Sequence, residues 1–189
     1  MLRLSLALLA TLSLSACRLG QPSQMVLSYS AYTGRPVVLT EMSVNGTAMA
    51  MIPAVVNGRA DTSKPRVGSL NQLLGYPAGK AGEMQLDMTW VELPSGAAYH
   101  AVVQVALKDL QRSSNGVEFM PVFGPGGLLI IASDPVPKGP GDKITRDVLR
   151  TCATRTPDAD RDYAATPREL PALSEALDMV DPSPATSTC

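Results

Sequence analysis

The sequence predicts a mainly β protein, a small antiparallel β-sandwich of about seven strands with one or two helices appended at its C-terminal end. Three observations predict this class. Apolar and polar residues alternate over several short runs between residues 25 and 133, as in half-buried strands. Turns rich in Asn, Gly and Pro separate these runs. Helical spacing of apolar residues begins only at residue 142.

The first predicted strands cover residues 25–33, 37–44 and 47–56. Between the second and third, Asn45-Gly46 predicts a two-residue hairpin, because both positions tolerate positive φ. Residues 59–82 form a long irregular connection, with one helical turn expected at 70–74. In the second strand, the side chains expected on one face are those of Val38, Thr40, Met42 and Val44.

The clearest strand covers residues 84–93, and a turn joins it to a second one at 98–110. Two further strands are expected at 117–123 and 128–133, joined by the glycine-rich turn 124–127. The last of these is apolar on both faces, which indicates a central strand. In the clearest strand, the side chains expected in the core are those of Met84, Leu86, Met88 and Trp90.

A Pro- and Gly-rich stretch after Asp134 predicts the end of the sheet region. The β-sandwich domain is therefore assigned to residues 25–134 and a helical extension to 135–180. Within the extension, a helix is expected over 142–153, capped by Asp142. A second is expected within 166–180, where Thr166 and Glu169 have capping-box spacing and Pro171 favours a later start. Residues 181–189 are assigned to a flexible tail.

Residues 1–16 have the features of a secretory signal peptide. One basic residue, Arg3, precedes an apolar run that is too short for a membrane-spanning helix, which needs roughly 20 residues. The sequence Leu-Ser-Ala-Cys at 14–17 resembles the bacterial lipobox, which implies cleavage before Cys17 and lipid attachment to it. The alternative is an ordinary cleaved signal peptide with an incidental cysteine.

The expected lipid determines where the protein resides. Each buried methylene contributes about 0.8 kcal/mol, so several acyl chains hold a protein on a membrane. Arg18 follows the cysteine, where Asp would signal retention at the inner membrane, so the outer membrane is favoured, with the protein facing the periplasm. Residues 17–24 are a short tether. The formal net charge is −1 and no basic stripe is present, so nucleic acid is not an expected partner.

Two cysteines remain after the lipid-bearing one. Cys152 and Cys189 could form a disulfide in the oxidising periplasm, which would hold the end of the tail in place. The sequence leaves their state open.

The sequence has no recognisable catalytic motif, so no enzyme activity and no cofactor are expected. The one histidine, His100, is expected on the exposed face of its strand, where an ordinary surface role is favoured over a catalytic one. Soft thioethers can bind Cu(I), but the methionines fall on alternating strand positions and are interpreted as core. These methionines are Met42, Met49, Met51, Met84, Met88 and Met120.

One acidic stretch has the spacing of a calcium loop. Asp158, Asp160 and Asp162 alternate, and Glu169 stands at the twelfth position. Tyr163 occupies the place where an EF-hand loop needs Gly. A solvated acidic linker is the favoured interpretation, with no metal.

Three segments carry a resemblance to a known family. The stretch 29–46 ends in Val-Asn-Gly, Trp90 lies in a later strand, and the Phe-Met-Pro region follows at 118–127. In these features the chain resembles a family of small bacterial lipoproteins of unknown domain function found beside lipase effectors of the type VI secretion system. The resemblance implies an immunity protein that binds such a phospholipase in a one-to-one complex and protects the cell.

The partner interface is expected in the loop 57–77, which mixes charged and apolar residues. An ordinary surface loop is the alternative. Two other functions also remain open, a structural or assembly lipoprotein of the envelope or of a secretion system, and a periplasmic enzyme or ligand carrier. The proposed interface residues are Arg59, Asp61, Lys64, Arg66 and Tyr76.

Overall fold

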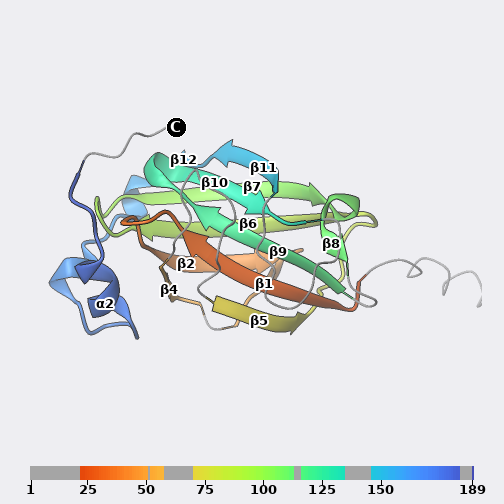
Figure 1. The fold of residues 1–189 in the computed structure, drawn as a ribbon, viewed down its shortest axis with the longest axis horizontal. Coiled ribbons are helices and arrows are strands. Elements are labelled where there is room, and N and C mark those ends of the chain that lie inside the picture. The colour runs from red at the N-terminus through yellow and green to blue at the C-terminus, as the bar shows by residue number, and fades with distance from the viewer. Residues whose placement is uncertain (1–21, 51, 58–69, 113–115, 135–145, 184–188) are drawn as a thin grey trace, which may run out of the picture.

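A computed structural model describes residues 22–50, 52–57, 70–112, 116–134, 146–183 and 189. Two sheets pack face to face, and a short helix lies at one end of the sandwich (Figure 1). The predicted fold class, a small β-sandwich with a helix near the C-terminus, is confirmed. The described residues form twelve strands rather than about seven. The predicted strand over 47–56 is divided in two, and four strands lie where none was expected, at 70–75, 111–112, 147–152 and 154–155.

The first sheet has the strand order β11-β10-β9-β1-β5, and β8 pairs with β9. Its neighbouring strands are antiparallel, except that β1 runs parallel to β9. These strands are β1 (Gln24–Ala31), β5 (Leu70–Gly75), β8 (Gln111–Arg112), β9 (Gly116–Phe123), β10 (Leu128–Ala132) and β11 (Asp147–Cys152).

The second sheet has the order β12-β7-β6-β2-β3, with β4 also paired to β2, and all its pairs are antiparallel. Its strands are β2 (Val37–Val44), β3 (Thr47–Ala48), β4 (Ala54–Val56), β6 (Glu83–Glu92), β7 (Ala98–Ala106) and β12 (Thr154–Arg155). Outside the sheets are the helix α2 (Leu173–Asp178) and the 3₁₀ turns η2 (Leu107–Asp109), η3 (Pro125–Gly127), η4 (Pro157–Ala159) and η5 (Tyr163–Ala165).

The main core lies between the two sheets and follows the predicted alternation. Trp90 of β6 packs against Phe123 of β9, with ring centroids 5.0 Å apart. Tyr29 of β1 is fully buried and donates its hydroxyl to Met42 Sδ at 3.5 Å, and burial raises its pKa to about 12. The four side chains predicted for the core of β6 are completely buried, namely Met84, Leu86, Met88 and Trp90.

Two predicted turns are confirmed. At Asn45-Gly46, which joins β2 to β3, φ is +50° and +75°, as a two-residue hairpin requires. The glycine-rich turn 124–127 joins β9 to β10 as an antiparallel hairpin. β10 lies between β9 and β11 and is buried along its whole length, so it is the central strand that its apolar sequence predicted.

The predicted helix over 142–153 is wrong, and with it the domain boundary at 134. Residues 147–152 form β11, which pairs with β10, and residues 154 and 155 form β12, which pairs with β7. The physical reason is that both edges of the buried strand β10 need hydrogen-bonding partners, and residues 147–152 supply one of them. The local sequence of these residues does not show this requirement. The sandwich therefore continues beyond the predicted boundary, and the proposed cap Asp142 lies outside the described residues.

Three smaller predictions are corrected. The turn expected to be helical at 70–74 is the strand β5, which pairs with β1. The strand expected over 47–56 is divided into β3 and β4, and a cis peptide bond between Ile52 and Pro53 precedes β4. A β-bulge at Thr40 shifts the register of β2, so Val37 and Leu39 face the main core and Val38 faces outward.

The second predicted helix is confirmed in part. α2 begins after Pro171, as expected, but has only six residues. The Thr166 hydroxyl donates to Glu169 Oε2 at 2.9 Å, yet these residues form turns rather than the start of the helix. Beyond α2, the Asp181 N–H donates to the Gly34 carbonyl at 2.9 Å, so this part of the predicted tail contacts the sandwich.

Candidate functional site

The outer face of the second sheet is divided into a covered half and an open half. On the covered half, Val38, Val91 and Ala98 align across three strands. Tyr163 and Leu173 of the C-terminal segment pack on them and are themselves buried. An apolar patch on an outer face needs such a cover, because exposing it to water costs free energy.

The open half carries six side chains, five of them polar, in two rows that run across the strands. Glu41, Thr89 and His100 form one row, and Ser43, Asp87 and Val102 form the other. The bulge at Thr40 is what turns Glu41 and Ser43 outward on β2. On β6 and β7 the alternation of the strand is sufficient, because the intervening residues are in the core. We call these six residues the open face.

Two contacts order the open face. His100 Nε2 lies 2.9 Å from Asp87 Oδ1, with side-chain exposures of 39% and 46%. The Thr89 hydroxyl donates to Glu41 Oε2 at 3.3 Å. Val102 stands beside the first pair and is 50% exposed, which makes it one of the few large apolar side chains on the surface of the described residues. His100 thus faces outward as predicted, on an open strand face.

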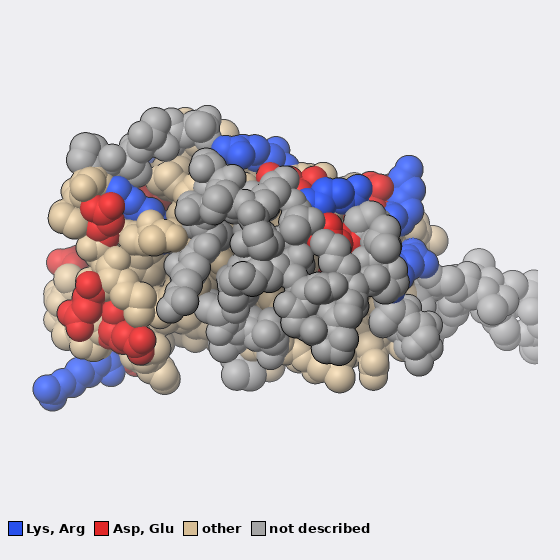
Figure 2. All heavy atoms as spheres, in the orientation of Figure 1, with Lys and Arg blue, Asp and Glu red and all other residues tan. Residues whose placement is uncertain are grey.

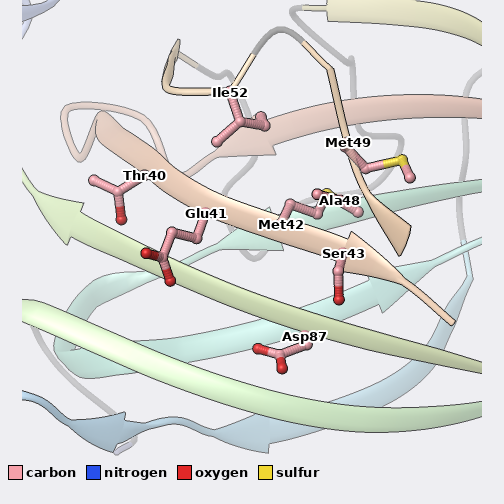
Figure 3. A pocket seen from close by; sticks show the side chains of 8 residues that line it. All are labelled: Thr40, Glu41, Met42, Ser43, Ala48, Met49, Ile52 and Asp87. Atoms are coloured by element: carbon pink, nitrogen blue, oxygen red, sulfur yellow. The ribbon is translucent and has the colours of Figure 1, made fainter. Parts of the chain in front are cut away.

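A groove of about 400 Å³ lies along β2 beside the open face. It forms where the chain leaves the sheet between β3 and β4. Glu41, Ser43 and Asp87 supply its polar wall, and Ser43 and Asp87 project to the same side (Figure 3). The full lining is Thr40, Glu41, Met42, Ser43, Ala48, Met49, Ile52 and Asp87.

The chemistry of the groove suits a side chain with an apolar stem and a donor at its tip. Met49 and Ile52, which are only partly buried, offer thioether and methyl groups to the stem. The carboxylates of Glu41 and Asp87 offer acceptors to an ammonium or guanidinium group. Sequence reasoning missed this site. The one sequence feature that could have indicated it is the turn between β6 and β7. This turn sets the register of the two strands, which brings Asp87 next to His100.

The predicted partner loop is only partly described. Arg59, Asp61, Lys64 and Arg66 lie outside the described residues, as does Cys17. Tyr76 is half-buried, packs against the main core, and donates its hydroxyl to the Glu83 carbonyl at 3.4 Å. Burial raises the pKa of Tyr76, while a hydrogen bond with Asn45 lowers it.

Three of the four acidic residues with calcium-loop spacing accept hydrogen bonds from neighbouring groups of the same chain. Asp160 accepts from Arg155 and, at 2.9 Å, from the Ala98 N–H. Asp162 accepts from the Ala164 N–H at 2.9 Å. Glu169 accepts from Arg161 through both carboxylate oxygens. In the described part of the chain, no group of three His, Cys, Asp or Glu side chains is placed to hold a metal.

The methionines of the described residues are mostly core, as interpreted from the sequence. Met42, Met84, Met88 and Met120 are buried, Met49 is partly buried, and Met51 lies outside the described residues.

Cys152 and Cys189 form a disulfide with a Cα–Cα distance of 5.6 Å. It joins the last residue of the chain to the end of β11. This is the pairing that the sequence allowed.

Comparison with known proteins identifies no relative. The chain matches no protein-family model, no curated protein and no solved structure. No helix among the described residues is long and apolar enough to cross a membrane. Function is therefore inferred from the residues and their geometry.

Proposed function

We propose that this protein is a lipid-anchored, periplasm-facing binding protein of the outer membrane that neutralises a type VI secretion phospholipase by binding it one-to-one. The observation that carries this proposal is the open face with its adjoining groove. It combines an apolar recess, a polar border and the exposed Val102 on a sheet whose other half is covered. Specific interfaces have this composition, with an apolar centre and a polar rim.

The surface is also rigid, which favours binding. The three strands that build it are paired through long registers, from Val37–Val44 on β2 to Ala98–Ala106 on β7. Their inner side chains belong to the main core. A preorganised surface loses little conformational entropy when a partner binds. Neutralisation by binding needs no catalytic group, only residence where the effector acts, which lipid attachment at Cys17 would supply.

The first experiment is a co-purification of this protein with the product of the adjacent gene, which the proposal expects to be a lipase. A stable one-to-one complex, with loss of phospholipase activity, is the expected result. No complex with a folded, active lipase would contradict the proposal. If deletion of the gene then impaired the envelope without any toxin present, the alternative role in envelope assembly would take its place.

Two matched variants test the open face. Val102→Arg places a bulky cation on it and should weaken binding at least about tenfold, which corresponds to about 1.4 kcal/mol. Met179→Arg changes another exposed apolar residue, 45% exposed just beyond α2, and should leave binding unchanged. If Val102→Arg binds normally while Arg59→Glu with Arg66→Glu does not, the interface is the 57–77 loop instead.

A further inference from the structure

The end of the sandwich where β1 begins is fixed by three neighbouring contacts. Gln24 is opposite Gly75 of β5 and also Gly116 of β9. The Tyr76 N–H donates to the Ser23 carbonyl at 3.0 Å. The segment before Pro22, which would contain the lipid-bearing Cys17, therefore joins the domain at this end. We call it the tether end.

The most exposed charges described at the tether end are cations. Lys80 follows the Tyr76 contact and its side chain is 75% exposed. Lys108 lies in η2, which the bond from the Leu107 N–H to the Gly82 carbonyl holds beside the start of β6. Arg112 of β8 is opposite Val117, next to the start of β9. Figure 2 shows Lys and Arg atoms at the right-hand end of the molecule, as well as along its upper side and at the left.

The acidic groups at this end are less accessible than the cations. Glu83 is half-buried and pairs with Lys80 at 2.9 Å. Asp109, Glu118 and Asp147 are also half-buried, and Asp134 is buried. An approaching anionic surface would therefore meet the three cations before these carboxyl groups.

An exposed apolar side chain lies near the same end. Leu73 is 67% exposed, the highest value among the large apolar residues on the described surface. It belongs to β5, at the edge of the first sheet, opposite Val26 of β1. Apolar and basic side chains on one surface are the combination that binds the interface of an anionic membrane.

The opposite end of the molecule has the reverse character. Residues 155–183 contain seven carboxylates and three arginines, and they cover the end where β1 finishes. Asp181 contacts Gly34 there, and Arg161 contacts Gly96 of the β6–β7 turn. Figure 2 shows the corresponding red atoms at the left. The eight residues of β1 separate the two ends by about 25 Å.

From these positions we propose that the tether end is a membrane-docking surface, with Lys80, Lys108 and Arg112 facing the phosphate groups of anionic lipids and Leu73 entering the interface. The inference rests on the lipid attachment in the proposed function. Residues 18–23 span at most about 20 Å, so the anchor holds this end close to the bilayer. Charge attraction then acts, because it extends over roughly 8–10 Å at physiological ionic strength. The acidic end points away from the membrane.

The test uses the lipidated mature chain in vesicles of phosphatidylethanolamine and phosphatidylglycerol that contain nitroxide-labelled lipid. Leu73→Cys introduces the one free thiol, since the lipid occupies Cys17 and a disulfide joins Cys152 to Cys189. A bimane label at this position should be quenched severalfold more than one at Met179→Cys, an exposed site near the other end. Both variants change exposed residues, and circular dichroism checks that they fold.

A charge-reversed chain completes the test. Lys80→Glu, Lys108→Glu and Arg112→Glu together should remove most of the difference in quenching, as should vesicles of phosphatidylcholine alone. Equal quenching at the two positions, or a difference unchanged by charge reversal, would overturn the proposal. The molecular mass of the purified chain shows whether the lipid is attached. A chain that carries no lipid would overturn the inference as well. Lipidated protein that shows the difference but does not bind the lipase would refute the proposed function alone.

Discussion

The carboxylate of Glu92 accepts a hydrogen bond from the Gly127 N–H at 3.0 Å, and this bond joins the two sheets at one end of the sandwich. Glu92 ends β6 in the second sheet, whereas Gly127 lies in the β9–β10 turn of the first. Glu92 is only 9% exposed, and its other oxygen accepts from the Ser95 hydroxyl at 3.2 Å. A buried carboxylate is tolerated here because donors meet both of its oxygens.

Removal of this acceptor should destabilise the fold. Glu92→Ala leaves the Gly127 N–H buried without its partner, so the free energy of unfolding should fall by about 1–3 kcal/mol. Glu92→Gln keeps an acceptor oxygen and should cost about 1 kcal/mol or less. Urea denaturation measures both. Equal losses in the two variants would show that the charge of Glu92, rather than its hydrogen bond, stabilises this end.

The partner residue offers a test of packing at the same place. Gly127 has φ of +81°, and a Cβ atom built on it would lie 2.4 Å from Tyr99 Cδ1. Gly127→Ala should therefore add overpacking of about 1–3 kcal/mol to the cost of the positive φ. Gly46→Ala is the matched control, with φ of +75° and no atom within 4 Å of the added Cβ. If the two variants lose the same stability, the contact with Tyr99 does not constrain the turn.

Loss of the disulfide should lower stability substantially. Cys152 and Cys189 are separated by 37 residues. Without the disulfide the unfolded chain gains conformational entropy. Cys152→Ser with Cys189→Ser should therefore lower the free energy of unfolding by about 3–4 kcal/mol. Urea denaturation of the wild type with a reductant should give the same value as this double variant. A reductant effect on the double variant itself would point to a different cause.

The ion pair of Asp160 predicts a dependence on pH. The hydrogen bond from Arg155, and then that from the Ala98 N–H, hold the pKa of Asp160 below its ordinary value of 3.8. A carboxyl group with a lowered pKa in the folded state stabilises the fold above its unfolded pKa, and the contribution disappears as the pH falls through the folded one. Asp160→Asn should therefore lose less stability than the wild type between about pH 6 and pH 2. Urea midpoints across this range measure it, and parallel curves would contradict the assignment.

Much of the fold could be predicted, because strand alternation is a local signal. The buried set on β6 and the hairpin at Asn45-Gly46 follow from period and turn chemistry alone. The open face could be predicted only in part. The sequence placed His100 outward but not its contact with Asp87, which depends on strand register. The groove depends on the bulge at Thr40 and on the departure of the chain from the sheet between β3 and β4, neither of which the alternation shows.

By itself, the sequence determined the class of the fold, its turns and the inward faces of its regular strands, because each depends on neighbouring residues. Only the tertiary structure decided that residues 147–152 and 70–75 are strands. Both segments are short and apolar enough to suit a helical turn or a strand, and both become strands by pairing with a buried strand distant in sequence. The physical reason is that unpaired backbone groups at the edges of β10 and β1 would cost more than either segment's local preference.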